Sequence, residues 1–301
     1  MQENRSYTFF GTLIVIGILC SFYVYRQIVS VPSNFPTGAT FTVVENESVR
    51  SISNRLREEG YINSALLFRA GVSFLEKDKT IHVGGYVFPA PYSLLSIINK
   101  FAGGRPDAPL LSVTIPEGSA TFQIAELIAK ALPGITLEKF QRIVSKDTAE
   151  GKLFPSTYFL LPSYTAEDIV RLMTSTFNKR VGTMLTASAI KDPLTKPEDV
   201  ITLASILEGE AKTPEDMQIV TGILLARLKK GMPLQVDVAK ETYKQKGLPS
   251  LPLNNPGLTA ISAVLNPTTT PYFYYLTGND GQMHYAKTFE EHKKNIKKYL
   301  K

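Results

Sequence analysis

The sequence predicts an α+β protein with two folded regions behind a single membrane-spanning helix. A chain of 301 residues can bury two hydrophobic cores. Its N-terminus carries a long uncharged apolar run, and the remainder mixes strand-like runs with apolar residues at helical spacing. We therefore divide the chain into a tail at 1–6, a membrane helix at 7–26, a linker at 27–39, and folded regions at 40–110 and 111–301.

Composition excludes several functional classes. Hydrophobic residues make up 44% and charged residues 20%, as in ordinary folded proteins. The net charge of +6 comes without a dense basic and aromatic cluster, which argues against nucleic-acid binding. Cys20 is the sole cysteine, and the motifs of zinc peptidases, serine hydrolases and P-loop NTPases are absent. We expect no cofactor and no metal.

The apolar run extends from Tyr7 to Tyr25. About 19 helical residues reach about 28 Å, close to the hydrocarbon thickness of a bilayer. No signal-peptide cleavage site follows, and a buried core helix is the weaker alternative. Arg5 and Arg26 balance each other, so the flanking charges do not set the orientation. The short tail and the large following region predict a single-pass plasma (inner) membrane protein whose folded part is exported.

Residues 40–110 follow the order β-α-α-β. A strand at 40–44 precedes a helix that Gly60 is placed to end, a second helix covers 64–75, and "IHVGGYVF" is a return strand. A further helix covers 92–102. The order resembles that of a LysM-type module, which implies glycan binding.

The second region begins with "LLSVTIPEGSA", a strand, a turn and a helix start. "TKPE" and "TPED" each combine a threonine cap, a proline in the first turn and acidic residues, so both begin helices. The expected elements are, in order, a helix at 121–132, a helix capped by Thr165, helices from 196 to about Ala211 and from Thr213 to about Lys230, a hairpin turning at Asp280-Gly281, and a helix capped by Thr288.

Two glutamates flank one glycine in "LASILEGEA", at the end of the helix that "TKPE" begins. Leu203, Ile206 and Leu207 form an apolar stripe that reaches Glu210 when it is continued. Glu208 lies about 200° around the helix from Glu210, on another face. A carboxyl group on a buried stripe, near the negative end of a helix dipole, should stay protonated and serve as a general acid. The alternative is a structural ion pair, for which the chain offers Lys212 and Arg227.

Five segments resemble, in order, the endolytic murein lytic transglycosylases, the YceG-like family. They are "LFPSTYFL", "LASILEGEA", "GILLARLKKGMPLQVD", "GLPSLPLNNPGLTAISAVLNPTTTPYFYYL" and "HYAKTFEEHKKNI". In the family's A-S-I-x-E-K-E signature the second glutamate is catalytic, and it corresponds to Glu210.

The resemblance implies a mixed α+β catalytic domain that cuts peptidoglycan between N-acetylmuramic acid and N-acetylglucosamine. The reaction is nonhydrolytic and leaves a 1,6-anhydromuramyl end. It further implies action on nascent glycan strands as their terminator, with peptidoglycan synthases as partners, and a glycan-holding role for the LysM-like region.

Several further polar and aromatic residues are candidates for the site. Gln235, Asp237 and Asn255 occupy polar motif positions and are predicted to bind sugar, with loop ordering as the alternative. Tyr158 is a candidate for stacking on a sugar, although core packing is the commoner fate of such an aromatic. Glu208 is expected either to contact the residues that bind substrate, without binding it itself, or to be solvated. His284 is expected either to contact the site or to have a structural role.

The chain departs from the family pattern in two places. Gly209 replaces the usual lysine, and the segment between Asp237 and Tyr243 is much shorter than usual. The shortening keeps two alternatives open. One is an inactive glycan-binding scaffold of the wall-synthesis machinery, and the other is a hydrolytic muramidase with Glu208 or Asp237 as second carboxylate.

Overall fold

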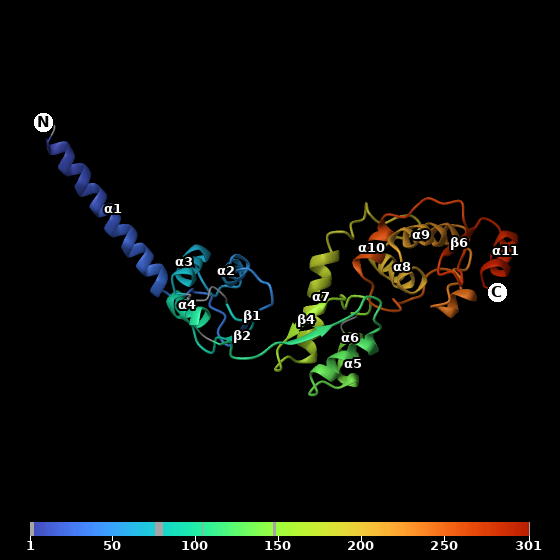
Figure 1. Ribbon diagram of the computed structural model, residues 1–301, viewed down its shortest axis with the longest axis horizontal. Coiled ribbons are helices and arrows are strands. Elements are labelled where there is room, and N and C mark those ends of the chain that lie inside the picture. The colour runs from blue at the N-terminus through green and yellow to red at the C-terminus, as the bar shows by residue number, and fades with distance from the viewer. Residues whose placement is uncertain (1–2, 76–80, 104, 147–148, 301) are drawn as a thin grey trace. The chain divides into compact units, whose positions relative to one another are not determined.

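The computed structural model describes residues 3–75, 81–103, 105–146 and 149–300, with side chains from residue 14 onward except that of residue 146. The chain divides into two compact units, Met1–Leu111 and Ser112–Lys301. Figure 1 shows their elements, and each unit is described by itself.

The first unit contains the predicted β-α-α-β order. Strand β1 (Thr40–Val43) pairs antiparallel with β2 (Gly84–Val87), and helices α2 (Val49–Glu58) and α3 (Ala65–Leu75) lie between them in sequence. Helix α1 (Glu3–Val29) precedes these elements and α4 (Leu94–Gly103) follows them. The core is aromatic, with Tyr86 stacked on Phe101 at a centroid distance of 4.1 Å and Phe41 against the same ring.

The predicted fold class is corrected in one component, the membrane-spanning helix at 7–26. That segment is helical within α1. Yet no helix in the described part of the chain is both long and apolar enough to cross a membrane. The described side chains of α1 begin at Ile14, and the remaining stretch to Val29 is shorter than the roughly 20 residues that a span needs. Residues 7–13 of the expected span lie outside the described side chains.

The second unit is a helical core with two small sheets. Strand β3 pairs with β4, and β5 pairs antiparallel with β6. Helices α8, α9 and α10 supply most of one continuous apolar cluster. The bounds are β3 (Leu111–Thr114), α5 (Thr121–Ala131), α6 (Leu137–Lys146), β4 (Thr157–Leu160), α7 (Ala166–Val181), α8 (Pro197–Glu210), α9 (Pro214–Lys229), the 3-10 turn η1 (Lys240–Tyr243), α10 (Leu258–Leu265), β5 (Tyr274–Thr277), β6 (Met283–Ala286) and α11 (Phe289–Tyr299).

Hydrogen bonds at their N-termini fix where α8 and α9 begin. The Thr213 hydroxyl accepts a hydrogen bond from the Asp216 N–H at 3.1 Å, which confirms the predicted cap of α9. At the start of α8 the predicted cap at Thr195 is wrong, because the N-cap is Lys196 and Asp199 accepts the N–H of Thr195 at 2.9 Å and that of Lys196 at 3.2 Å. Glu210 is the last residue of α8, and α9 starts four residues later.

Candidate active site

Glu210 lines a groove of about 570 Å³ in the second unit. The last turn of α8, the segment that leads into η1, strand β5 and one side of α11 form its walls. This volume falls in the range of sites that hold small ligands. Besides Glu210, the polar side chains in the lining are those of Arg227, Gln235, Asp237, Tyr243, Tyr274, Tyr275, Thr277 and His292.

The Glu210 carboxyl group is held from two sides. The Tyr275 hydroxyl donates to Oε2 at 2.9 Å, and the Val238 N–H points at Oε1 from 3.4 Å. Burial raises the pKa of Glu210; these two hydrogen bonds oppose the rise, and the nearby charge of Asp237 adds to it. The net upward shift favours a proton on this carboxyl group, the state that a general acid requires.

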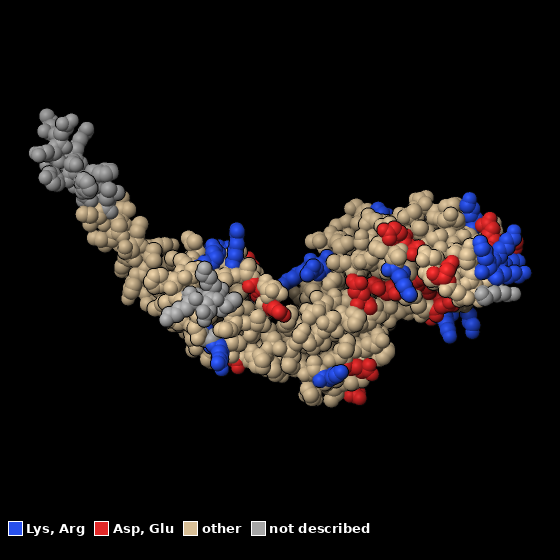
Figure 2. Space-filling model, viewed as in Figure 1, with Lys and Arg blue, Asp and Glu red and all other residues tan. Residues whose placement is uncertain are grey.

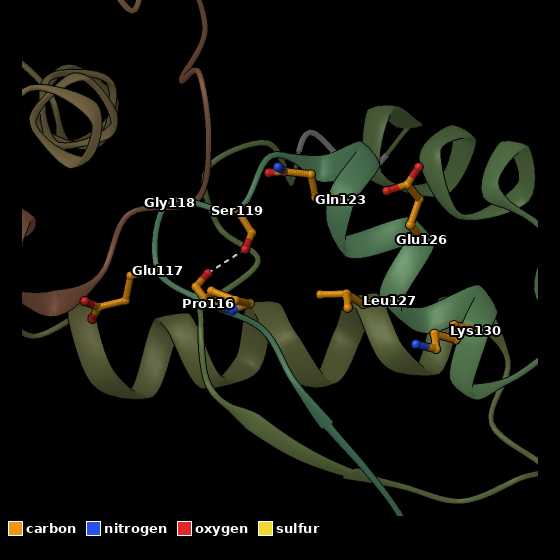
Figure 3. Close-up of a pocket in the computed structure, with 8 residues that line it drawn as sticks. All are labelled: Pro116, Glu117, Gly118, Ser119, Gln123, Glu126, Leu127 and Lys130. Atoms are coloured by element: carbon orange, nitrogen blue, oxygen red, sulfur yellow. Dashed lines mark hydrogen bonds between the residues drawn. The ribbon is translucent and has the colours of Figure 1, made fainter.

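Glu208 faces a different part of the unit. Its Oε1 accepts the Gly257 N–H at 2.7 Å, and a side chain at position 257 would collide with the Glu117 carboxyl group. Burial raises the pKa of Glu208, the Gly257 N–H lowers it, and the charge of Glu117 raises it further. Glu117 lines a second cavity, of about 550 Å³, along α5. In Figure 3 its side chain lies at the opposite end of that cavity from Lys130.

The structure brings Gln235 and Asp237 into the Glu210 groove. Both are exposed, and the Tyr243 hydroxyl donates to Asp237 Oδ1 at 2.7 Å. Gln235 adopts a φ of 51°, in the left-handed region. Their hydrogen-bonding atoms are therefore available to a ligand in the groove.

Asn255 and Tyr158 do not line this groove. Asn255 is 1% exposed, and its side chain accepts the Leu153 N–H and donates to the Ser119 carbonyl, which ties the 254–257 loop to the turn after β3. Tyr158 is 5% exposed and donates to the Phe154 carbonyl at 2.6 Å, and burial raises its pKa to about 12. Little of either side chain is open to a sugar.

His284 lies on the hairpin away from Glu210. Its Nε2 is 3.0 Å from an Asp280 oxygen, and its ring stacks on Tyr299 at 3.4 Å. These contacts hold the hairpin tip against α11.

Sequence reasoning missed three groove residues, Tyr274, Tyr275 and His292. The "YFYY" run marks the two tyrosines only as strand and core, and His292 lies in the helix that Thr288 caps; no local pattern tells which distant side chain each of them will meet. The sequence also suggested Arg227 as an ion-pair partner of Glu210. No such pair occurs within the described residues, and Arg227 instead donates to two backbone carbonyls.

The shortened segment after Asp237 closes over the end of α8. A Cβ at Gly209 would lie 2.4 Å from Val238 Cγ1, so the backbone of α8 and the segment are in close contact there. Glycine at 209 and the short segment therefore fit each other, which gives a physical reason for both departures.

Helix α11 forms the outer wall and has two different sides. Phe289, His292 and Ile296 line the groove. Figure 2 shows lysine side chains gathered where Figure 1 places α11, and Lys293, Lys294, Lys297 and Lys298 of this helix are exposed.

Comparison with known proteins gives the same family throughout. The model of the YceG-like family matches residues 41–240 and 241–298. The chain is 28% identical to an endolytic murein transglycosylase of Bacillus subtilis, over 88% of this chain and 85% of that one. It is 26% identical to an endolytic murein transglycosylase of Streptococcus pneumoniae, over 92% of this chain, and spans 61% of the length of that relative.

A solved structure supports the fold. The crystal structure of a YceG-like protein from Listeria monocytogenes superposes with a TM-score of 0.54 at 24% identity, covering 85% of this chain and 98% of that one. At this identity the likeness concerns the fold alone. Together with a family model that spans most of both units, it shows that the chain belongs to the YceG-like family.

Proposed function

We propose that this chain is an endolytic murein lytic transglycosylase in which Glu210 is the catalytic residue. The observation that carries the proposal is a half-buried carboxyl group with a raised pKa, held by a tyrosine at the wall of a ligand-sized groove. The names of the two relatives support the choice of substrate and reaction.

The reaction needs one carboxyl group in two protonation states. The protonated Glu210 gives its proton to the glycosidic oxygen as the bond from C1 of N-acetylmuramic acid to that oxygen breaks. The muramyl C6 oxygen then bonds to C1, and its proton passes to the Glu210 carboxylate. The acid is regenerated, no water is consumed, and the product is a 1,6-anhydro ring. The substrate's own hydroxyl supplies the nucleophile at close range.

Asp237 gives the hydrolytic alternative a specific basis. It lines the same groove as Glu210, and its charge contributes to the raised pKa of Glu210. Hydrolytic glycosidases use two such flanking carboxyl groups. Product analysis separates the two mechanisms, because hydrolysis leaves reducing ends and a lytic reaction leaves anhydro ends.

The deciding experiment treats purified glycan strands with the full chain and analyses the products by mass. Anhydro ends are expected from the wild type, and none from Glu210→Gln, which keeps the shape of the side chain and one of its two acceptor oxygens. Glu208→Gln, the same change two residues away, should keep measurable cleavage, and Glu290→Gln on exposed α11 should match the wild type. Wild-type turnover in Glu210→Gln would refute the role of Glu210.

The biological setting follows from the substrate. Peptidoglycan lies outside the plasma membrane, so the second unit would act on the extracytoplasmic side, on strands as synthases release them, and would set their length. The β-α-α-β unit would hold the same glycan. Depleting the protein in living cells should lengthen the glycan strands, and unchanged strand lengths would contradict this role.

A further inference from the structure

A buried cation in the wall of the Glu210 groove has no acidic partner among the residues that the structure describes. Arg227 is 4% exposed and lines the groove. Its Nε donates to the Phe273 carbonyl at 2.7 Å and its Nη1 to the Leu234 carbonyl at 2.5 Å. No carboxylate pairs with it in the described part of the chain. A buried charge is normally paired, because its removal from water is costly.

The remaining guanidinium donors are oriented by this anchoring. The two carbonyls fix one side of a rigid planar group that carries five N–H donors. The Tyr274 ring lies 5.2 Å from Arg227 Cζ and favours its charge through the ring face. Arg227 Nη2 makes no hydrogen bond to any residue that the structure describes. A fixed, uncompensated donor in a groove wall is suited to bind an anionic or carbonyl oxygen.

His292 contacts the same tyrosine ring as Arg227, and one of its ring nitrogens lacks a hydrogen-bond partner among the described residues. Its ring stacks on Tyr274 at 5.4 Å, and its Nδ1 is buried without a partner within the described residues. Burial lowers the pKa of His292, and the charge of Arg227 lowers it further, so the ring is neutral near neutral pH. Arg227, Tyr274 and His292 thus form one wall of the groove, and Tyr275, the next residue of β5, holds Glu210.

We propose that Arg227 and His292 form the subsite for the lactyl group of N-acetylmuramic acid. This deepens the proposed function and rests on it. The lactyl ether distinguishes muramic acid from glucosamine, and it ends in a carboxyl group that is either free or joined to a peptide through an amide. A guanidinium binds the free carboxylate most strongly and still donates to the amide carbonyl. The wall would therefore place muramic acid, rather than glucosamine, with its C1 at Glu210.

The test measures binding in the Glu210→Gln chain, which does not consume its ligand. Three tetrasaccharides of equal length are compared: one with free lactyl carboxylates, its lactyl methylamide, and chitotetraose, which has no lactyl group. The carboxylate should bind about tenfold or more tightly than chitotetraose, and the amide should fall between them. Equal affinities for the three ligands would overturn the subsite, and because only the ligand changes in this comparison, a folding defect cannot cause that result.

Substitutions in Arg227 and His292 then test whether these residues cause the preference for the lactyl ligands over chitotetraose. Adding Arg227→Gln or His292→Gln should reduce the preference, because binding of the carboxylate ligand weakens more than binding of chitotetraose, and Arg227→Lys should retain part of it. Lys293→Gln, on the outer side of α11, should leave it unchanged. If Arg227→Gln fails to fold because two carbonyls lose their donor, His292→Gln and the ligand series still decide. A preference that survives both substitutions would overturn the subsite, whereas the proposed function is judged separately, by the anhydro ends from the wild type and their loss in Glu210→Gln.

Discussion

Removing one hydroxyl group, by Tyr275→Phe, tests the protonation of Glu210 directly. The Tyr275 hydroxyl donates to Glu210 Oε2 at 2.9 Å, and this bond lowers the pKa of Glu210 against the effect of burial. A hydrogen bond to a charged group contributes about 1.5–3 kcal/mol, and about 1.4 kcal/mol corresponds to one pKa unit. The pKa of Glu210 should therefore rise by about one unit or more in the variant.

The sign of the effect on activity follows from the role of the acid. Cleavage needs the protonated carboxyl group, so activity falls as the pH rises through its pKa. In Tyr275→Phe the alkaline limb of kcat/KM should move to higher pH by about one unit. Anhydro ends released from purified strands across a pH series measure this limb. Tyr285→Phe is the matched control, because that hydroxyl lies on the same hairpin but donates to Asp216. A limb that stays in place or moves to lower pH would refute the reasoning.

Three further predictions concern stability and packing. Burial raises the pKa of Glu210 in the folded chain, so the free energy of unfolding falls as the pH rises through that pKa. Glu210→Gln should therefore resist urea better than the wild type at about pH 8. The difference between the two proteins should shrink at about pH 4. Asn255→Ala should cost about 2–3 kcal/mol in urea unfolding, because buried backbone groups lose their partners. Gly209→Ala should displace Val238 and slow cleavage by about tenfold to a hundredfold, while Gly134→Ala, with open space at its Cβ, should not.

Local rules predicted the elements and the critical glutamate. Thr213 and Thr288 are predicted as caps because each is followed three residues later by an acid, and both do cap their helices, whereas Thr195, with the same spacing, lies one residue before the N-cap of α8. Glu210 was selected because the apolar stripe of α8 runs to it, and the structure places it at a groove.

Contacts between distant segments were beyond such rules. Tyr275 and Glu210 are 65 residues apart, and only the tertiary fold brings them together. Asn255 looked like a sugar ligand because polar loop residues often are, yet its amide serves the backbone of a turn 136 residues away. The pairing of Arg227 with Glu210 failed for the same reason, since the carbonyls that hold Arg227 leave no sign in the sequence.

One wall of the groove is the least anchored helix of its unit. Helix α11 has no buried residue, and it rests on the hairpin of β5 and β6. Such an element detaches locally at little free-energy cost. A sugar that fills the groove adds contacts to Phe289, His292 and Ile296, so saccharide affinity and helix attachment are thermodynamically linked. Amide hydrogens of α11 should consequently exchange more slowly once the groove is occupied, and mutations that loosen the helix should weaken binding without any contact to the ligand.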